Sequence, residues 1–260
     1  MRIVMTELVR VLFVLTLLLG RSRGSCQTEP SRAEVCLYTF KYVGLTVAHG
    51  AITISDTIGD DDQPARQIDA RATSLPATSF LFMIKNRYTT VVDSHTGYPL
   101  LYEKDIEQSN LCEKVITRFN EEGRMARCGD GEEIDLSLPT HTFFSALLHM
   151  IRRTFQPREV VRLPVYAAGL VWEARAEAVR AEKLVTPAGT YQTVCVEVSF
   201  ERSAPLNRRE KSTDVLTNRL IREGAKTYLW FSTGHRRILV KAEYELFPSR
   251  LHMILNEHHR

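Results

Sequence analysis

The sequence lacks an apolar run long enough to cross a membrane as a helix. Its strongest run covers residues 11–19, whereas a membrane-spanning helix needs roughly 20 apolar residues. A short run with Arg10 near its start and small residues up to Gly24 after it is typical of a cleavable signal peptide. We therefore expect residues 1–24 to be removed on export, leaving residues 25–260 as one mature domain without a transmembrane segment.

Two alternatives concern the processing of this leader. Cleavage after Ser22 would also satisfy the preference for small residues at the cleavage site. Cys26 stands where a lipoprotein would carry its acyl anchor, but Arg23 occupies a position at which an apolar residue is preferred. We expect a periplasmic protein, and an outer-membrane lipoprotein anchored through Cys26 is the alternative.

An excess of one charge is also missing once the leader is subtracted. The full chain has 34 Lys and Arg against 31 Asp and Glu, a formal net charge of +3. Four of the arginines and one of the glutamates belong to the leader, so the mature chain carries 30 residues of each sign. Long-range attraction to a polyanion then has no basis, and we expect no nucleic-acid partner.

Signatures of catalysis and of metal binding are absent as well. The sequence has no Gly-x-Ser-x-Gly, no His-Glu-x-x-His and no phosphate-binding glycine loop. His252, His258 and His259 are close in sequence near the chain end, which we interpret as a mobile end with an accidental grouping. We therefore expect a protein that is not an enzyme and that uses no cofactor or metal.

All five cysteines follow the leader, and export makes disulfides possible. Cys112 and Cys128 lie sixteen residues apart on either side of an expected loop at residues 120–123. A bridge between them would stabilise the hairpin by about 3 kcal/mol on the chain-entropy model, and we predict this disulfide. A Cys26–Cys36 bridge stays open, as does the alternative that all five are reduced; Cys195 is interpreted as a buried strand thiol.

Alternation of apolar and polar residues dominates what is present. Residues 36–42 place Tyr38, Phe40 and Tyr42 on one face, which predicts a half-buried strand. The same pattern predicts strands over residues 45–49, 51–58, 67–74, 88–93, 99–108, 111–119, 124–128, 160–166, 170–186, 189–201, 226–232 and 237–247. Many strands separated by short turns favour a sandwich or a barrel.

Two segments predict helices, and a third departs in composition. Residues 76–85 are apolar nearly all round, whereas residues 139–153 carry an apolar stripe and end in two arginines, which suit the negative end of a helix dipole. Their apolar members include Phe80, Phe82, Met83, Phe143, Phe144 and Leu147. Residues 203–225 are dense in charge, and we interpret them as an insertion between two strands.

Three pieces of sequence, in this order, resemble the domain-of-unknown-function family 3108 (DUF3108), a set of Gram-negative envelope proteins. Residues 38–50 resemble its opening strand pair, residues 186–191 its Thr-Pro-x-Gly turn, and residues 230–238 its closing Trp–Ser–Arg strand. The resemblance covers about residues 36 to 250. The family often has an aspartate soon after that serine and a proline where Leu239 stands, so a role tied to the aspartate does not carry over.

The family is similar in architecture to the lipoprotein carriers LolA and LolB. The resemblance therefore implies an α+β domain, mostly β, in which a half-open antiparallel β-barrel (a strongly bent sheet) wraps two apolar helices. It implies no reaction, and a lipid-handling role only by analogy.

Two functions remain open. A binding module would hold a lipid or another amphiphile on its concave face, with Arg236 and Arg237 at the rim beside Trp230. The residues expected to line that face are Phe80, Phe82, Met83, Phe143, Phe144 and Leu147. In the alternative, the same residues fill a core and the outer strands bind another envelope protein. Cavity volume separates the two, because a carrier needs roughly 300 Å³ or more; we favour the binding module slightly.

Overall fold

A computed structural model of the protein describes residues 33–59, 62–79, 83–109, 111–120, 122–129, 131–167, 169–203, 214, 219–246 and 249–260. The predicted signal peptide, Cys26, Phe80 and Phe82 lie outside the described residues, as does most of the charged segment 203–225.

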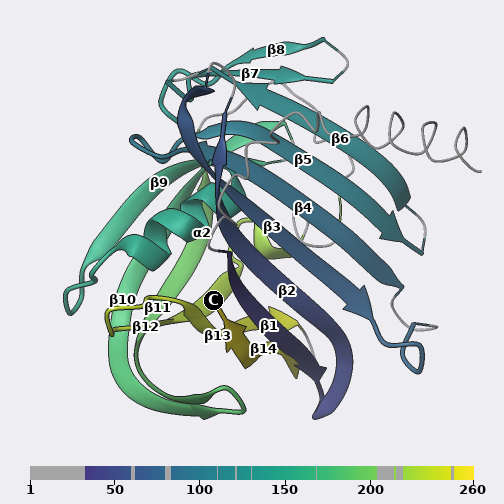
Figure 1. Ribbon diagram of the computed structural model, residues 1–260, viewed down its shortest axis with the longest axis vertical. Helices are drawn as coiled ribbons and strands as arrows, with labels where there is room; N and C mark the ends of the chain where they lie inside the picture. Colours follow the sequence, from purple (N-terminus) through teal and green to yellow (C-terminus); the bar gives the residue numbers. More distant parts are fainter. Residues whose placement is uncertain are drawn as a thin grey trace, which may run out of the picture. The chain divides into compact units, whose positions relative to one another are not determined.

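The described chain forms one antiparallel sheet of fourteen strands (Figure 1). The strands are β1 (Glu34–Tyr42), β2 (Leu45–Ile58), β3 (Pro64–Ser74), β4 (Ile84–Asp93), β5 (Pro99–Gln108), β6 (Leu111–Phe119), β7 (Met125–Cys128), β8 (Glu133–Asp135), β9 (Val160–Ala167), β10 (Leu170–Thr186), β11 (Gly189–Arg202), β12 (Lys226–Ser232), β13 (Leu239–Leu246) and β14 (Ser249–His259). Their order in the sheet is β8-β7-β6-β5-β4-β3-β2-β1-β14-β13-β12-β11-β10-β9. Strands that follow one another in the sequence are therefore paired, except β8 and β9, which form the two edges of the sheet, and the β1–β14 pair joins the first and last described strands.

Alternation in the sequence explains these strands. In β4, Tyr88, Thr90 and Val92 are buried while the residues between them are more exposed, because successive side chains of a strand point to opposite faces. The strands predicted over residues 99–108, 111–119, 170–186 and 226–232 coincide with β5, β6, β10 and β12. The mostly β, antiparallel part of the predicted fold is confirmed.

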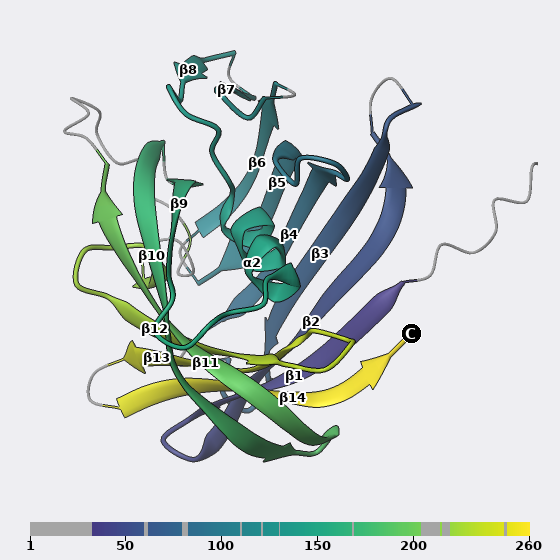
Figure 2. The ribbon, with the colours of Figure 1, turned by 90° about the vertical axis from the view of Figure 1, so that its left-hand side faces the viewer.

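The sheet bends so that its two halves face each other across the helix α2 (Phe143–Arg152) (Figure 2). A capping box begins α2: the Thr142 hydroxyl accepts a hydrogen bond from the Ser145 backbone N–H, and the Ser145 hydroxyl accepts one from the Thr142 N–H. The second predicted helix is therefore present, although it begins later than residue 139. No helix among the described residues has the length and apolar character that a membrane span requires.

The segment that precedes α2 connects the two edges of the sheet. The Thr140 N–H donates to the carbonyl of Gly123, beside β7, at 2.9 Å. The His141 N–H donates to the carbonyl of Pro164 in β9 at 2.8 Å, and the Tyr166 N–H donates back to the carbonyl of His141 at 2.7 Å. The strand ladder itself is not closed, because β8 and β9 remain its two ends.

The helix predicted over residues 76–85 is wrong where the structure describes it. Residues 76–79 form a turn, and Ile84 and Lys85 already belong to β4. The Ile84 N–H donates to the Ser74 hydroxyl at 3.0 Å, which starts β4 beside the end of β3. A short apolar run fits either a strand or a buried helix, and its periodicity does not separate them.

The sequence analysis interpreted the chain end as mobile, but these residues form β14, which is paired within the sheet between β1 and β13. Its three histidines each contact a different carboxylate: His252 with Glu243, His258 with Glu34, and His259 with Glu257. The strand β14 was not predicted because the polar residues at its end interrupt the alternation of apolar and polar residues.

The predicted Cys112–Cys128 disulfide is wrong, since both cysteines are free thiols. The predicted hairpin of β6 and β7 exists, but Cys128 stands opposite Thr117. Cys112 precedes Thr117 by five residues in β6, which corresponds to about 17 Å at the rise of a strand. This is beyond the ~7 Å that a disulfide tolerates between Cα atoms. The other described cysteines, Cys36 and Cys195, are buried thiols, and burial raises the pKa of each to about 11.

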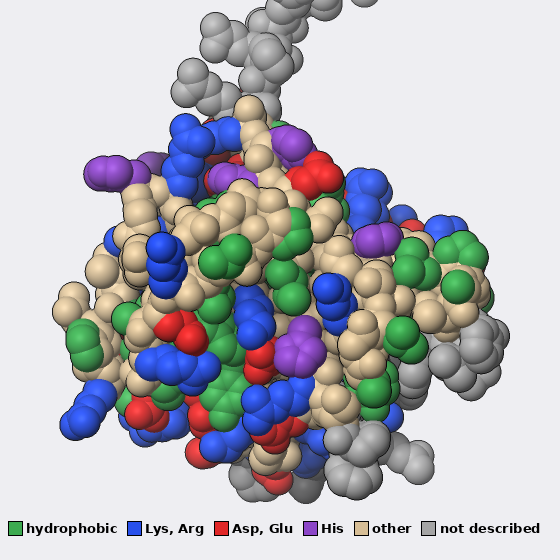
Figure 3. All heavy atoms as spheres, turned by 90° about the horizontal axis from the view of Figure 1, so that it is seen from below, with side chains coloured by type: hydrophobic (Ala, Val, Ile, Leu, Met, Phe, Trp, Pro, Cys, Tyr) green, Lys and Arg blue, Asp and Glu red, His purple; other side chains and the backbone are tan. Residues whose placement is uncertain are grey.

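Apolar packing forms two clusters. The larger joins the concave faces of both halves of the sheet to α2, through residues such as Ile106, Leu147 and Phe231. The smaller includes Tyr38 and Leu255, against which the tip of the β10–β11 hairpin packs. On the side of the molecule that Figure 3 shows, acidic and basic side chains are interspersed, in line with the similar numbers of each in the sequence.

Candidate functional site

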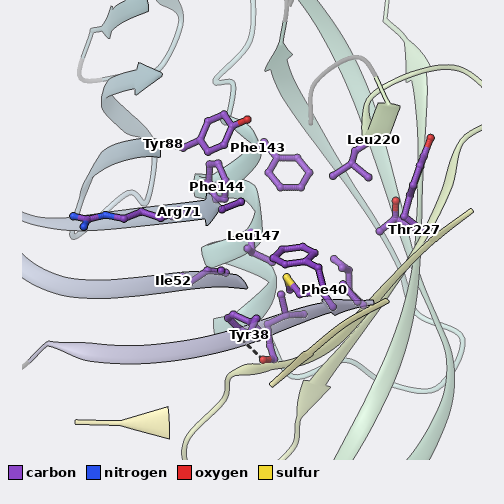
Figure 4. A pocket seen from close by; sticks show the side chains of 18 of the residues that line it. Tyr38, Phe40, Ile52, Arg71, Tyr88, Phe143, Phe144, Leu147, Leu220 and Thr227 are labelled. Carbon is purple, nitrogen blue, oxygen red and sulfur yellow. Dashed lines mark hydrogen bonds between the residues drawn. The ribbon is translucent and has the colours of Figure 1, made fainter. Parts of the chain in front are cut away.

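An apolar pocket of about 140 Å³ lies between α2 and the concave face of the sheet (Figure 4). From α2, Phe143, Phe144 and Leu147 line it. The rest of the described lining is Tyr38, Phe40, Gly50, Ala51, Ile52, Ala70, Arg71, Ala72, Tyr88, Leu220, Thr227, Leu229, Leu239, Ala242, Tyr244, Leu251 and Met253. The pocket thus combines strands from both ends of the sequence.

The helix side of the pocket is fixed by ring packing. The centroid of the Phe144 ring lies 5.2 Å from that of Phe143, at a nearly perpendicular angle of 84°. Phe144 also packs against the ring of Tyr88 from β4, with centroids 5.2 Å apart. Leu147 follows one turn later on the same face of α2, so these side chains form a continuous apolar wall (Figure 4).

A glycine makes room for the opposite wall. A Cβ atom at Gly50 would come within 2.6 Å of the Phe40 ring and 3.1 Å of the Arg71 carbonyl oxygen. Gly50, which the sequence suggested as a boundary between two strands, is instead paired within β2, opposite Tyr38 of β1 and Ala72 of β3. The absent side chain lets the Phe40 ring cross the neighbouring strand and line the pocket.

A buried polar network adjoins the pocket at Tyr88. The Tyr88 hydroxyl donates to the Asp214 carboxylate at 2.8 Å, and Lys104 Nζ donates to the same carboxylate at 3.4 Å. The Asn86 side-chain amide donates to the Tyr88 hydroxyl at 2.9 Å. Burial, and next the charge of Asp214, raise the pKa of Tyr88 well above its ordinary value, so its hydroxyl stays protonated.

Asp214 changes the interpretation of the charged segment 203–225. Its side chain is fully buried, and that of Lys104 is only 10% exposed. The Tyr244 hydroxyl donates to the carbonyl of Arg219, and Leu220 lines the pocket. The described part of this insertion is therefore anchored to the sheet by a buried charge.

One buried polar atom of the lining has no partner. The Thr227 hydroxyl is buried, lines the pocket and makes no hydrogen bond within the described structure. A buried hydroxyl without a partner costs free energy, so the pocket offers one polar contact to an occupant.

The structure brings only part of the predicted site together. Phe143, Phe144 and Leu147 line the pocket as expected. Met83 is 39% exposed and is not part of the lining. Trp230 is buried elsewhere: its indole N–H donates to Glu182 at 2.6 Å, and the Lys241 ammonium lies 4.5 Å from its ring centroid.

Arg236 and Arg237 do not reach the rim of this pocket. Arg236 is exposed in the turn between β12 and β13. Arg237 donates to the carbonyl of Arg152 at 2.8 Å and to the Thr154 hydroxyl, and it lines a separate polar groove. An anionic head group held by these arginines would therefore lie outside the apolar pocket.

The sequence profile of the DUF3108 family, described as proteins of unknown function, matches residues 37–255. The chain belongs to the DUF3108 family. Its further likeness to the carriers LolA and LolB stays a prediction. No curated protein matches the chain in sequence.

Among solved structures, this DUF3108 member resembles a β-barrel-like protein of the domain-of-unknown-function family DUF1849 from Brucella abortus. The TM-score is 0.53 at 9% sequence identity, over 87% of this chain and 95% of that one. A protein with a YmcC-like fold from Bacteroides fragilis gives a TM-score of 0.38, also at 9% identity and with the same coverage. At this identity, the likeness to the DUF1849 protein concerns the fold alone.

Sequence reasoning missed several lining residues of this DUF3108 protein. Tyr38 and Phe40 were placed on one face of a strand, but nothing indicated that this face meets α2. Met253 and Leu251 belong to β14, which was not predicted. The signal that could have found them is the alternation of Leu251, Met253 and Leu255.

Proposed function

We propose that this DUF3108 protein is a non-enzymatic binding module of the periplasm whose concave face holds one slim apolar group, such as the end of an acyl chain. The observation that carries the proposal is the apolar pocket of about 140 Å³ between α2 and the sheet. The periplasmic location follows from the expected signal peptide and stays part of the proposal.

The size of the pocket defines the class of ligand. A cavity of roughly 150 Å³ lined by aliphatic and aromatic side chains stays dry and admits a molecule of the size of benzene. Pockets that enclose a drug-sized ligand measure about 300–1,000 Å³. The pocket is smaller than the roughly 300 Å³ expected above of a carrier, so a whole lipid does not fit inside, whereas the end of one chain does. Among the described lining residues, the Thr227 hydroxyl is the buried polar group without a partner.

The chemistry of the lining supports binding rather than catalysis. The described lining residues include no histidine, aspartate or glutamate, so the threonine and tyrosine hydroxyls of the lining have no general base among them. The nearby carboxylate of Asp214 is engaged by Tyr88 and Lys104.

A cavity-filling variant tests the proposal. Ala70 is buried and lines the pocket, so A70L places three more carbon atoms in the empty space. Protein purified from its own host is examined by native mass spectrometry and then by organic extraction. We expect a co-purifying amphiphile in the wild type that A70L loses. The exposed Ala181 provides the matched control A181L, which should retain it. Apo wild-type protein that yields no extractable amphiphile refutes the proposal.

A second candidate is a module that binds another envelope protein, and the β1–β2 turn favours it. Val43 and Leu45 are 63% and 67% exposed, and Val43 has a φ of 49°, which β-branched residues rarely adopt. Exposed apolar side chains on a strained turn are a candidate contact surface. A photo-crosslinking residue at position 45 tests this: one discrete cross-linked envelope protein, together with an empty pocket, would favour this candidate.

A further inference from the structure

A second, polar groove of about 760 Å³ lies at the end of α2. Arg66 of β3, Arg152 of α2 and Arg237 of the β12–β13 turn line it, together with His235. Apolar side chains such as Ile151 form another part of its wall. The described linings of the groove and of the apolar pocket share no residue, so the two are separate sites.

Positive charge in the groove is only partly neutralised. Arg66 Nε lies 3.0 Å from the Asp56 carboxylate, and the lining residue Glu34 contacts His258 at 2.9 Å. Neither Arg152 nor Arg237 forms an ion pair with an acidic side chain of the described chain.

The neighbour of Arg152 gives the contrast. Arg153 forms an ion pair with Glu159. Arginines on the strands form similar pairs, such as Arg162 with Glu173 and Arg175 with Glu177. Arg152 instead faces Arg66 across the groove. Burial and then the charge of Arg66 lower the pKa of Arg152, and the charge of Asp56, which forms an ion pair with Arg66, offsets this only in part. An anion between the two would relieve this repulsion.

Arg237 is held in position before any ligand arrives. Its guanidinium donates to the carbonyl of Arg152 and to the Thr154 hydroxyl, which fixes the side chain at the end of α2. A positioned guanidinium loses less conformational entropy on binding than a free one. The hydroxyls of Thr154 and Thr233 add hydrogen-bonding groups to the groove.

We propose that this groove binds a phosphate group, with Arg152 as its main ligand and Arg66 and Arg237 as supporting positive charges. Guanidinium groups match the geometry of phosphate oxygens, which they contact through two parallel hydrogen bonds. The phosphate could belong to a free phosphate compound or to a lipid head group. This inference goes beyond the proposed function and does not depend on the apolar pocket.

Isothermal titration calorimetry on the full mature chain tests the proposal with two probes, inorganic phosphate and octyl phosphate below its micellar concentration. We expect binding that weakens about tenfold or more in R152Q, because a charge-assisted contact is lost. R152Q should fold normally, because the contact that Arg237 makes with this residue uses the backbone carbonyl of Arg152, which the substitution keeps. R236Q is the matched control, because Arg236 is exposed, precedes Arg237 in the sequence and does not line the groove.

Similar affinities for the two probes would support a free phosphate compound, and much tighter binding of octyl phosphate would support a lipid head group. Absence of binding to the wild type, or equal affinities of R152Q and R236Q, would overturn the site. The pocket variant A70L should bind inorganic phosphate as the wild type does, so failure of the proposed function and failure of this site are distinguishable.

Discussion

The two cavities beside α2 differ in how their polar groups are satisfied. Beside the apolar pocket, Tyr88, Lys104 and Asp214 hydrogen-bond to one another out of contact with solvent. In the polar groove, Arg152 lines the cavity and forms no ion pair with a described carboxylate, and Asp56 is already paired with Arg66. In this buried network the charges of Lys104 and Asp214 neutralise each other, although the side-chain oxygen of Asn86 has no partner among the described residues. A buried, paired network of this kind stabilises one structure, whereas a charge without an ion pair in an open groove is available to a ligand. The comparison therefore assigns a structural role to the first set and a binding role to the second.

The largest effect that sharpens this comparison is expected from the wall of the apolar pocket. F144A should destabilise the protein by about 4 kcal/mol, because it removes a buried ring and enlarges an existing cavity. F143A should cost clearly less, since Phe143 is only partly buried. Urea denaturation measures both. Equal losses for the two variants would mean that Phe144 does not anchor α2.

The buried network should give the next largest effect. D214A leaves Lys104 buried without its counter-charge, and we expect a loss of about 3 kcal/mol. The double variant K104M/D214L should recover most of it, because an apolar pair needs no counter-charge. Thermal unfolding of the three proteins checks this. A D214A protein as stable as the wild type would show that the insertion is not anchored through this carboxylate.

A pH dependence is expected at the start of α2. His141 is buried beside His149 and Tyr98, and burial, followed by the charge of His149, lowers the pKa of His141 to about 4. In the unfolded chain the pKa returns to its ordinary value near 6.5. The unfolded state therefore binds the proton first, and stability falls as the pH drops from about 6.5 to about 4, by about 3 kcal/mol.

Urea denaturation across this pH range measures the effect of His141. The variant H141Q should show a shallower loss of stability towards acid, even if its stability at neutral pH is lower. The same slope in H141Q and in the wild type would falsify the assignment to this histidine.

The smallest effect lies away from both cavities, at the β1–β2 turn. Asparagine tolerates a positive φ better than valine does, so V43N should relieve backbone strain and stabilise the fold by about 1 kcal/mol. Differential scanning calorimetry should register a higher Tm. A lower Tm would indicate that the exposed Val43 side chain makes a stabilising contact.

Sequence reasoning succeeded where one local signal determines structure. Alternation located most strands, because each strand of this sheet has one buried face. The apolar stripe of residues 143–151 located α2 for the same reason. A helix was predicted over residues 76–85 because this apolar run has no period that separates a helix from a strand. The strand β14 was missed because charged and polar residues obscure the alternation of Leu251 and Met253.

The misplacement of Trp230 follows from the alternation within β12. Trp230 and Phe231 are successive residues of this strand, and their side chains therefore point to opposite faces of the sheet. Phe231 joins the core against α2, whereas Trp230 packs with Glu182 and Lys241. The disulfide failed similarly: the hairpin was correct, but the pairing of Cys128 with Thr117 depends on the turn.

The sequence by itself determined most of the strands, the apolar face of α2 and, through its ordered motifs, membership in the DUF3108 family. Only the tertiary structure decided that β1 pairs with β14, that Phe40 crosses Gly50 into the pocket, and that Arg152 and Arg66 face one groove. Local alternation fixes which face of a strand is buried, because it depends on neighbouring residues alone. Which buried faces meet depends on the bend of the sheet and on contacts between residues far apart in the chain, and no local pattern encodes these.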